Sequence, residues 1–134
     1  MADSFQFELV SPERLLVSEA ATAILAPGSD GYMTIMAGHS PLMTTLKPGV
    51  VVVTTAGGAD RRFYVRGGFA DITNASMIVL AEHAMPVEEM DPAQLDRQIK
   101  DAEEDVTDAK TPEARSKAEQ QLSALRDARS ALGM

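Results

Sequence analysis

The amino-acid sequence predicts a mainly β protein with an α-helical tail: a β-sandwich over residues 1–86 and an antiparallel helical hairpin over residues 87–134. Short runs rich in Val, Ile, Thr, Phe and Tyr recur before Pro86 and are separated by turn-forming residues, a pattern typical of all-β domains. Some of these runs alternate and others are continuously apolar, which favours two stacked sheets of about nine or ten strands. After Pro86 the apolar residues follow the period of a helix.

Alternating apolar residues define the strands that have one buried face. Phe5, Phe7 and Leu9 are separated by single polar residues, and Phe63 and Val65 repeat this spacing further along the chain. Because neighbouring side chains of a strand point to opposite faces, each set is expected on one side of its strand and in the core.

Other strands are predicted from runs without alternation and from the turns between them. Val50–Val53 and Met77–Leu80 are apolar throughout, as expected of strands covered on both faces. Lys47–Gly49 contains the Pro-Gly pair of a type II turn, and Ala56–Asp60 is predicted to be a hairpin loop. Gly67–Gly68 is interpreted as a turn or bulge, since glycine readily adopts positive φ.

The first helix of the tail is predicted to start just after Asp91. Asp is a favoured N-cap residue, and Pro92 stands at the first helical position, where its missing N–H costs no hydrogen bond. Apolar residues then recur at steps of four and three, which places them along one stripe of the helix: Leu95, Ile99, Ala102, Val106 and Ala109.

A second helix is predicted after Thr111 and Pro112, which repeat the cap-and-proline signal; its apolar stripe is Ala118, Leu122, Leu125 and Leu132. Residues 88–109 carry nine acidic and two basic side chains, and residues 110–134 carry three acidic and five basic ones, so the two helices are expected to attract each other. The apolar seam is mostly Ala. The hairpin is therefore predicted to be weakly stable unless it docks on the rest of the chain.

The composition excludes several classes of partner and site. The 134 residues carry a formal net charge of −8, with a pI near 4.6, and only 4% are aromatic. Such a chain repels phosphate backbones and anionic lipids, so neither nucleic acid nor bare membrane is an expected partner. Cysteine is absent, which removes disulfides and thiolate chemistry. The N-terminus lacks a signal-peptide pattern and no apolar run reaches the ~20 residues of a bilayer span, so we expect a cytoplasmic protein.

No catalytic, metal or cofactor site is predicted. The two histidines, His39 and His83, lie outside any metal-ligand spacing such as HExxH. A triad of Ser40, His39 and Asp30 is not supported, because adjacent Ser and His side chains project apart and no nucleophile elbow is present. The glycines form neither of the glycine-rich phosphate-binding motifs.

The residues alone leave two interpretations of His39 open. It lies in the polar break Ala37–Pro41 between two predicted strands. One reading is a loop imidazole bonded to a nearby backbone carbonyl. The other is an interface residue, because loops on a rigid scaffold carry much of molecular recognition.

Several separated segments together resemble the epsilon subunit of F-type ATP synthases, called delta in mitochondrial nomenclature. The resemblance rests on the order and spacing of six segments: Phe7–Glu13, Ala26–Gly31, Gly38–Leu42, Leu46–Gly49, Val65–Ala70 and Val79–Ala84. It implies a ten-stranded β-sandwich and a non-catalytic rotor subunit of the central stalk, which couples proton flow to ATP synthesis. It also implies a location on the cytoplasmic face of the bacterial inner membrane, with membrane contact only through the complex.

The resemblance also implies partners and the residues that meet them. The loop formed by Gly28, Ser29, Asp30, Gly31 and Tyr32 would face the ring of c subunits, and its composition is that of an exposed acidic turn. The gamma subunit would be met by His39, Ser40, Pro41, Leu42, Met43, Thr44 and Thr45. The complex would also include the alpha/beta catalytic hexamer.

One departure from the family bears on nucleotide binding. In ATP-binding members the first tail helix begins with an aliphatic residue, Asp, two variable residues, Arg and Ala, whereas here Gln94 and Leu95 replace the last two. Loss of the Arg removes a charge that could meet phosphate. Asp91 is retained, but its function as N-cap already accounts for it. We therefore expect little or no ATP binding. Whether the hairpin regulates ATP hydrolysis stays open.

Two other functions compete with a rotor subunit. The first is a free-standing module whose hairpin senses nucleotide, which would purify as a monomer that binds ATP. The second is a small enzyme using His39, which would lose turnover on His39→Ala. Stoichiometric copurification with gamma and the catalytic hexamer would instead identify a coupling subunit.

Overall fold

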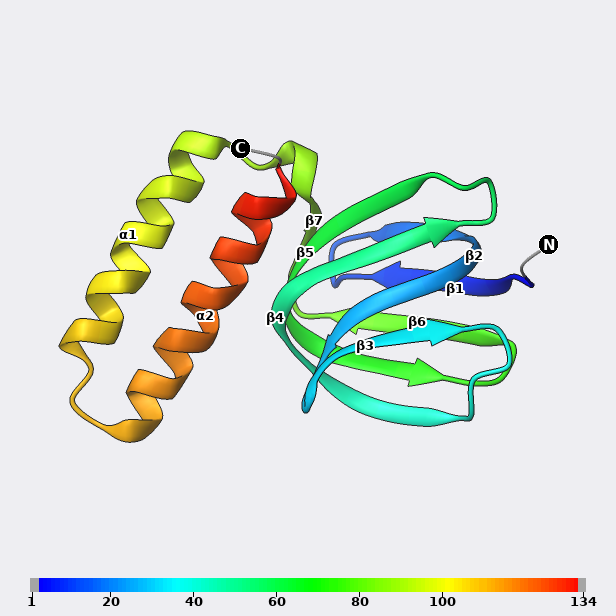
Figure 1. The fold of residues 1–134 in the computed structure, drawn as a ribbon, viewed down its shortest axis with the longest axis horizontal. Coiled ribbons are helices and arrows are strands. Elements are labelled where there is room, and N and C mark those ends of the chain that lie inside the picture. The colour runs from blue at the N-terminus through cyan, green and yellow to red at the C-terminus, as the bar shows by residue number, and fades with distance from the viewer. Residues whose placement is uncertain (1–2, 133–134) are drawn as a thin grey trace.

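The computed structural model describes residues 3–132, which form a β-barrel with a helical hairpin against its side (Figure 1). The strands are β1 (Phe5–Val10), β2 (Leu15–Gly28), β3 (Gly31–Met36), β4 (Leu42–Thr55), β5 (Asp60–Ile72), β6 (Ser76–Ala81) and β7 (Ala84–Pro86). A short 3₁₀ turn, η1 (Val87–Glu89), leads to the helices α1 (Pro92–Asp108) and α2 (Pro112–Ala131). The mainly β class with a C-terminal helical hairpin is thus confirmed.

The strands of residues 3–132 form one seven-stranded sheet that closes on itself. Its order is β1-β6-β5-β4-β2-β3, and β1 also pairs with β2, so β1, β6, β5, β4 and β2 complete a ring. β3 extends the sheet beyond β2, and β7 pairs with β5. The β1–β6 pair is parallel and the other pairs are antiparallel.

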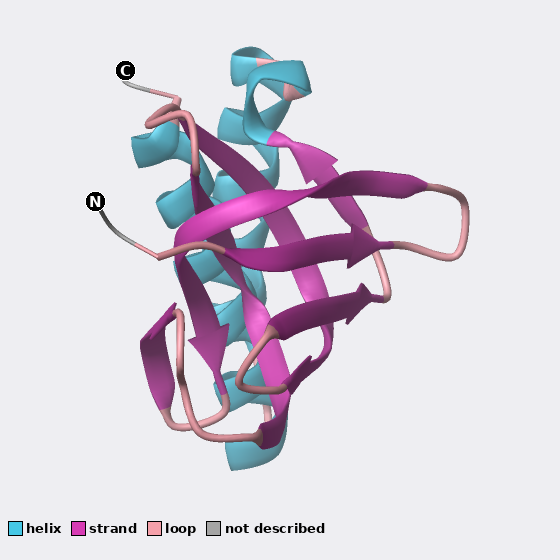
Figure 2. Cartoon of the chain, turned by 90° about the vertical axis from the view of Figure 1, so that its right-hand side faces the viewer, coloured by secondary structure: helices cyan, strands magenta, loops and turns pink. Residues whose placement is uncertain are grey.

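The ten-stranded count is wrong for residues 3–132, because β4 continues through the turn predicted at Lys47–Gly49 and β5 continues through Gly67–Gly68. β2 and β4 each span 14 residues and β5 spans 13, and they curve around the barrel instead of ending (Figures 1 and 2). Register shifts within β2, between Ala21 and Ala23 and between Leu25 and Gly28, accompany this curvature. A bend carried by bulges and glycines looks like a turn in the sequence but keeps the strand paired.

The predicted turn at Lys47–Gly49 is the main case. Pro48 pairs with Arg66 and Gly49 with Val65, so this segment is the middle of β4. Gly67–Gly68 does not end β5 either, although both glycines have positive φ. A Cβ at Gly68 would collide with the Leu80 carbonyl oxygen of β6. The two bends are neighbours across the β4–β5 ladder, and glycine is needed there for the close approach of three strands.

The barrel interior holds the alternating residues that the sequence assigns to the core. Phe5, Phe7 and Leu9 of β1 are buried together with Phe63 and Val65 of β5, which confirms the prediction. The five belong to one cluster that is formed entirely by residues of the β-strands. The barrel therefore has an apolar interior to which the hairpin contributes no side chain.

The two continuously apolar runs, Val50–Val53 and Met77–Leu80, have different surroundings. Val51 and Val53 of β4 point into the barrel while Val50 packs against the hairpin, so this strand is covered on both faces as predicted. The prediction is wrong for the second run, because Leu80 of β6 is 45% exposed. The hairpin lies against β4 and β5, which leaves the outer side of β6 uncovered (Figure 1).

Both helices begin where the capping residues predict. The Asp91 side chain accepts a hydrogen bond of 3.0 Å from the Ala93 N–H, and the Thr111 hydroxyl accepts one of 3.1 Å from the Ala114 N–H. Cross-helix ion pairs also form as expected from the charges. One of them joins Arg129 Nε to Asp96 Oδ1 at 2.7 Å.

Helix α2 is buried on two sides because it lies between α1 and the barrel (Figure 1). Leu122 and Leu125 are buried as predicted, but Ala124 and Ala128 are buried as well. With Val50, Tyr64 and helix residues they form a second apolar cluster outside the barrel. The hairpin therefore docks, which supplies the stability that its thin seam lacks.

Candidate partner-binding surface

The loop Gly28–Tyr32 is the turn between β2 and β3. Gly28 pairs with Gly31 at the end of the ladder, which leaves Ser29 and Asp30 exposed at the tip. Gly31 has φ of +127°, a conformation that other residues rarely adopt. The turn thus presents a hydroxyl and a carboxylate to solvent on a short, closely paired loop.

Residues His39–Thr45 span the turn from β3 to β4 and the start of β4. The His39 N–H donates to the Met36 carbonyl oxygen at 3.1 Å, which closes the turn. The His39 ring Nδ1 lies 2.7 Å from the Ser40 carbonyl oxygen. This contact agrees with the first interpretation of His39, a loop imidazole bonded to a nearby backbone carbonyl. It directs the ring to the Ser40 backbone and not to a nucleophile.

The fold brings these two predicted segments together. Ser29 Oγ and Thr44 Oγ1 are 3.4 Å apart, and Gly28 pairs with Leu46 in the ladder between β2 and β4. The loop predicted to face the c ring and the segment predicted to face gamma are therefore parts of one continuous surface.

This surface continues from Met43 onto exposed apolar side chains of β5 and β6 that the sequence analysis missed. Met43 is 68% exposed, and Phe69 and Leu80 on the next two strands are each 45% exposed. Thr45 pairs with Phe69 and Phe69 with Leu80, so these positions share the outer face of the barrel. We call Met43, Phe69 and Leu80 the apolar face.

A sequence signal for Phe69 was available. Phe69 falls on the opposite parity of β5 from Ala70 and Ile72, which are both buried in the barrel. A large aromatic residue out of phase with the core residues of its own strand must face outward.

Tyr32 differs from the rest of its loop because it contacts the hairpin. Its hydroxyl donates to Asp127 Oδ2 of α2 at 2.8 Å and accepts from the Val50 N–H of β4 at 3.1 Å. Burial raises the pKa of Tyr32 to about 12, and the hydrogen bond and charge of Asp127 act in the same direction, against the opposing effect of the Val50 N–H. The neutral phenol is thus favoured at this position.

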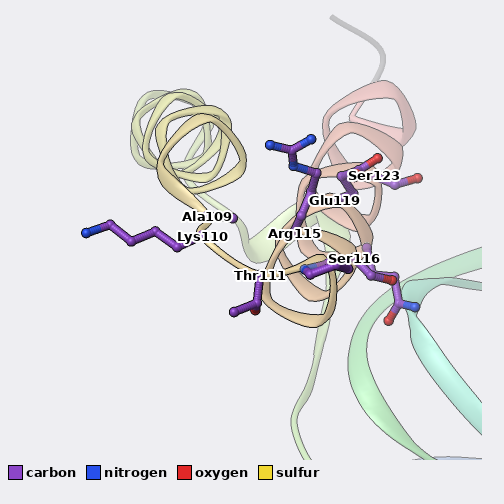
Figure 3. Close-up of a pocket in the computed structure, with 9 residues that line it drawn as sticks. Ala109, Lys110, Thr111, Arg115, Ser116, Glu119 and Ser123 are labelled. Carbon is purple, nitrogen blue, oxygen red and sulfur yellow. The ribbon is translucent and has the colours of Figure 1, made fainter.

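The turn between α1 and α2 carries a hollow of about 580 Å³ that is not a convincing ligand site. Its polar side chains are exposed, and Lys110 and Arg115 extend away from each other and do not converge (Figure 3). Within residues 3–132, no three His, Cys, Asp or Glu side chains are grouped to hold a metal ion.

Comparison with known proteins decides the family. Residues 4–87 match the family model described as ATP synthase, Delta/Epsilon chain, beta-sandwich domain. The chain belongs to this family. It is 58% identical over 125 residues to the ATP synthase epsilon chain of Mesorhizobium japonicum, and the match covers 93% of each chain. The epsilon chain of Brucella anthropi is 55% identical over 89% of this chain and 88% of its own length.

Solved structures share the fold at low identity. A chain in the Euglena gracilis mitochondrial ATP synthase (OSCP/F1/c-ring) matches with a TM-score of 0.81 at 24% identity, covering 96% of this chain and 81% of that one. A chain in the Tetrahymena thermophila central stalk and c-ring structure matches with a TM-score of 0.68 at 14% identity, over 97% of both chains. The family resemblance seen in the sequence is confirmed. As an epsilon chain, this protein is a non-catalytic rotor subunit of the ATP synthase central stalk.

The residues of this epsilon chain at the start of α1 are poorly suited to a nucleotide. Asp91 acts as the N-cap, and Gln94 is exposed beside a hollow of about 300 Å³ that Glu89 also lines. Neither Lys nor Arg lines this hollow, whereas the carboxylates of Glu89 and Asp91 do, beside the imidazole of His83. The two carboxylates would repel a bound phosphate. None of the helices in residues 3–132 has the length and hydropathy needed to cross a membrane.

Proposed function

We propose that this epsilon chain couples the rotor by presenting two adjacent surfaces to two partners: the Gly28–Tyr32 loop, called the tip loop below, to the c ring, and the apolar face to gamma. The observation that carries the proposal is the position of the hairpin. It covers the outer side of β4 and β5 at Val50 and Tyr64 and leaves the outer side at Met43 and Phe69 open. Only the second area is available to another subunit.

The apolar face suits gamma, because the centre of a stable protein interface is apolar and excludes water. Met43, Phe69 and Leu80 are large side chains on three neighbouring strands, β4, β5 and β6. Exposed apolar groups of this size on a rigid sheet are stabilised by burial against a partner, at about 25 cal/mol for each Å² removed from water. His39, Ser40, Thr44 and Thr45 flank Met43 in the sequence and would form part of the polar rim of this face.

The tip loop suits the c ring through different chemistry. Ser29 and Asp30 offer one hydroxyl and one carboxylate on a closely paired turn, which fits a polar or basic loop of the partner. Because Ser29 touches Thr44, the c-ring contact and the gamma contact would be mechanically continuous. A rotor subunit requires such continuity in order to turn with both partners.

The remaining partners and the location follow from assembly. In the complex the chain would share the central stalk with gamma beneath the alpha/beta hexamer. It would be held at the cytoplasmic face of the bacterial inner membrane through the c ring. The hairpin lies docked on the barrel and would not be needed for either proposed contact.

Copurification of variants with gamma tests the proposal. Met43→Ser should weaken retention of the subunit on the soluble gamma-containing complex, because it puts a hydroxyl in the apolar face. Met36→Ser is the matched control, since Met36 is also exposed but lies on β3, apart from β5 and β6 in the sheet. Equal retention of both variants would exclude the apolar face from the gamma interface, and a purified chain that is always monomeric would refute the rotor assignment.

A further inference from the structure

Both tyrosines of the chain bond to helix α2, although they come from different strands. Tyr32 of β3 donates to Asp127 Oδ2 at 2.8 Å, and Tyr64 of β5 accepts from Gln121 Nε2 at 3.0 Å. Among residues 3–132, these are the side-chain hydrogen bonds that join a strand to a helix of the hairpin. They identify the phenol groups as polar anchors at the apolar cluster on which the hairpin docks.

The Tyr32 hydroxyl joins three elements at a single atom. It gives its only proton to Asp127 on α2 and accepts the Val50 N–H of β4, while its own backbone ends the tip loop. Donor and acceptor capacity are thus both used, and the acceptor is a carboxylate, which makes the O–H bond one of the stronger kind. Tyr64 lacks this arrangement, because its partner is a neutral amide.

The surroundings of Tyr32 are shaped to admit its hydroxyl. A Cβ at Gly49 would lie 2.7 Å from the Tyr32 oxygen, so the missing side chain at this position makes room for the phenol. Beside the bond lies a hollow of about 180 Å³, lined by Gly28 and Gly31 of the loop and by Gln120 of α2. The rest of the loop is therefore not packed tightly against the helix, and Tyr32 provides the direct connection.

We propose that Tyr32 is a latch that couples the conformation of the Gly28–Tyr32 loop to docking of the hairpin. With the hydroxyl bonded, the loop end is held on β4 and α2 is held on the barrel. A change that displaces the Tyr32 hydroxyl weakens the docking of α2, and undocking of α2 destabilises the loop end by the same free energy, because coupling between two sites is reciprocal. The proposal holds whatever partner the loop binds, so it does not depend on the proposed function.

Amide hydrogen exchange of the full-length chain tests the latch. Tyr32→Phe keeps the ring and removes the hydroxyl, and it should speed exchange in α1 and α2 by about tenfold or more, because it removes a bond to a carboxylate and the acceptor of the Val50 N–H. Barrel amides that face away from α2 should be unchanged. Asp127→Ala should also speed exchange in both helices, although Ala favours a helix more than Asp does. Tyr32→Phe also leaves the Val50 N–H without its acceptor, so its effect should be at least as large as that of Asp127→Ala. The double variant should not exceed Tyr32→Phe, because the Asp127 bond is already lost in that single variant.

The coupling itself is measured in the loop and at Val50, on the barrel side of the Tyr32–Asp127 bond. Asp127→Ala lies on the helix, yet it should speed exchange of the Val50 N–H and shift the amide resonances of Ser29 to Tyr32. Tyr64→Phe is the control: it should loosen the hairpin but leave the Tyr32–Asp127 bond of the docked state intact, so the amide resonances of Ser29 to Tyr32 should not shift. Unchanged hairpin exchange in Tyr32→Phe, additive effects in the double variant, or an unchanged loop in Asp127→Ala would each overturn the proposal.

Discussion

Ser29 Oγ lies 3.4 Å from Thr44 Oγ1, which joins the tip loop to the first residues of β4. The contact makes two segments that are separate in sequence into one side of the barrel. It also shows which part of the loop is free for a partner. Ser29 and Asp30 project at the tip, whereas Tyr32 is occupied by Asp127.

The tip loop can therefore be tested without disturbing the hairpin. Ser29→Ala with Asp30→Ala should change the free energy of unfolding by only about 0.5 kcal/mol, because both residues are exposed. We expect weaker assembly with membranes and less proton pumping per ATP hydrolysed. Pumping in inverted vesicles and thermal unfolding of the free subunit measure the two effects.

Tyr32 is best left unchanged in that experiment, since its substitution would add the loss of the Asp127 bond. Retention of the double variant on soluble gamma-containing complex is the control. Normal pumping with intact assembly would remove Ser29 and Asp30 from the functional interface, and a large loss of stability would give them a structural function.

Stability should fall at high pH in a manner that depends on Tyr32. Burial raises its pKa to about 12 from the ordinary value of 10.0. A raised pKa means that the docked state favours the neutral phenol, so this contribution is complete below pH 10 and is lost as pH rises towards 12. The charged groups beside the phenol are Asp127 of α2 and Lys47 of β4.

Two measurements check this dependence. In Tyr64→Phe, the phenolate absorbance reports Tyr32 alone, and its titration midpoint should lie well above 10.0. Urea unfolding between pH 8 and 12 should show a steeper loss of stability for the native chain than for Tyr32→Phe. Parallel curves for the two proteins would contradict the prediction.

The barrel is predicted to fold without the hairpin. A chain that stops at Val87 keeps the whole interior cluster, which consists of strand residues alone, but exposes Val50 and Tyr64. We expect a cooperative thermal transition with a Tm lowered by about 5–10 °C, because one to two kcal/mol of burial is lost. Circular dichroism measures the transition, and NMR spectra without dispersion would show that the barrel depends on the helices.

ATP should not bind tightly to the isolated chain. The hollow at the start of α1 is lined by Glu89 and Asp91 and by neither Lys nor Arg, so a triphosphate would meet like charge. Isothermal titration calorimetry should give no saturable binding in the micromolar range. Saturable heat would mean that cations elsewhere reach the nucleotide, and Asp91→Asn would then show whether this hollow is the site.

The predictions from the sequence succeeded where local chemistry decides the structure. The caps at Asp91 and Thr111 bond to Ala93 and Ala114, since an N-cap acts within two or three residues. The alternation of Phe5 and its neighbours also holds, because side-chain direction along a strand depends on the strand alone. The interface assignments for the tip loop and for His39 to Thr45 remain predictions.

The sequence by itself determined the class of the fold, the family and the starts of both helices, because periodicity, capping and motif order are local or linear properties. Tertiary structure decided what depends on neighbours distant in the chain. Pro48 and Gly67 look like turns until β4 and β5 are paired, where they become adjoining bends of continuous strands. Leu80 is exposed because the hairpin docks on β4 and β5 instead of β6. Tyr32 bonds to Asp127 only because docking brings together two residues far apart in sequence, and no local pattern carries that contact.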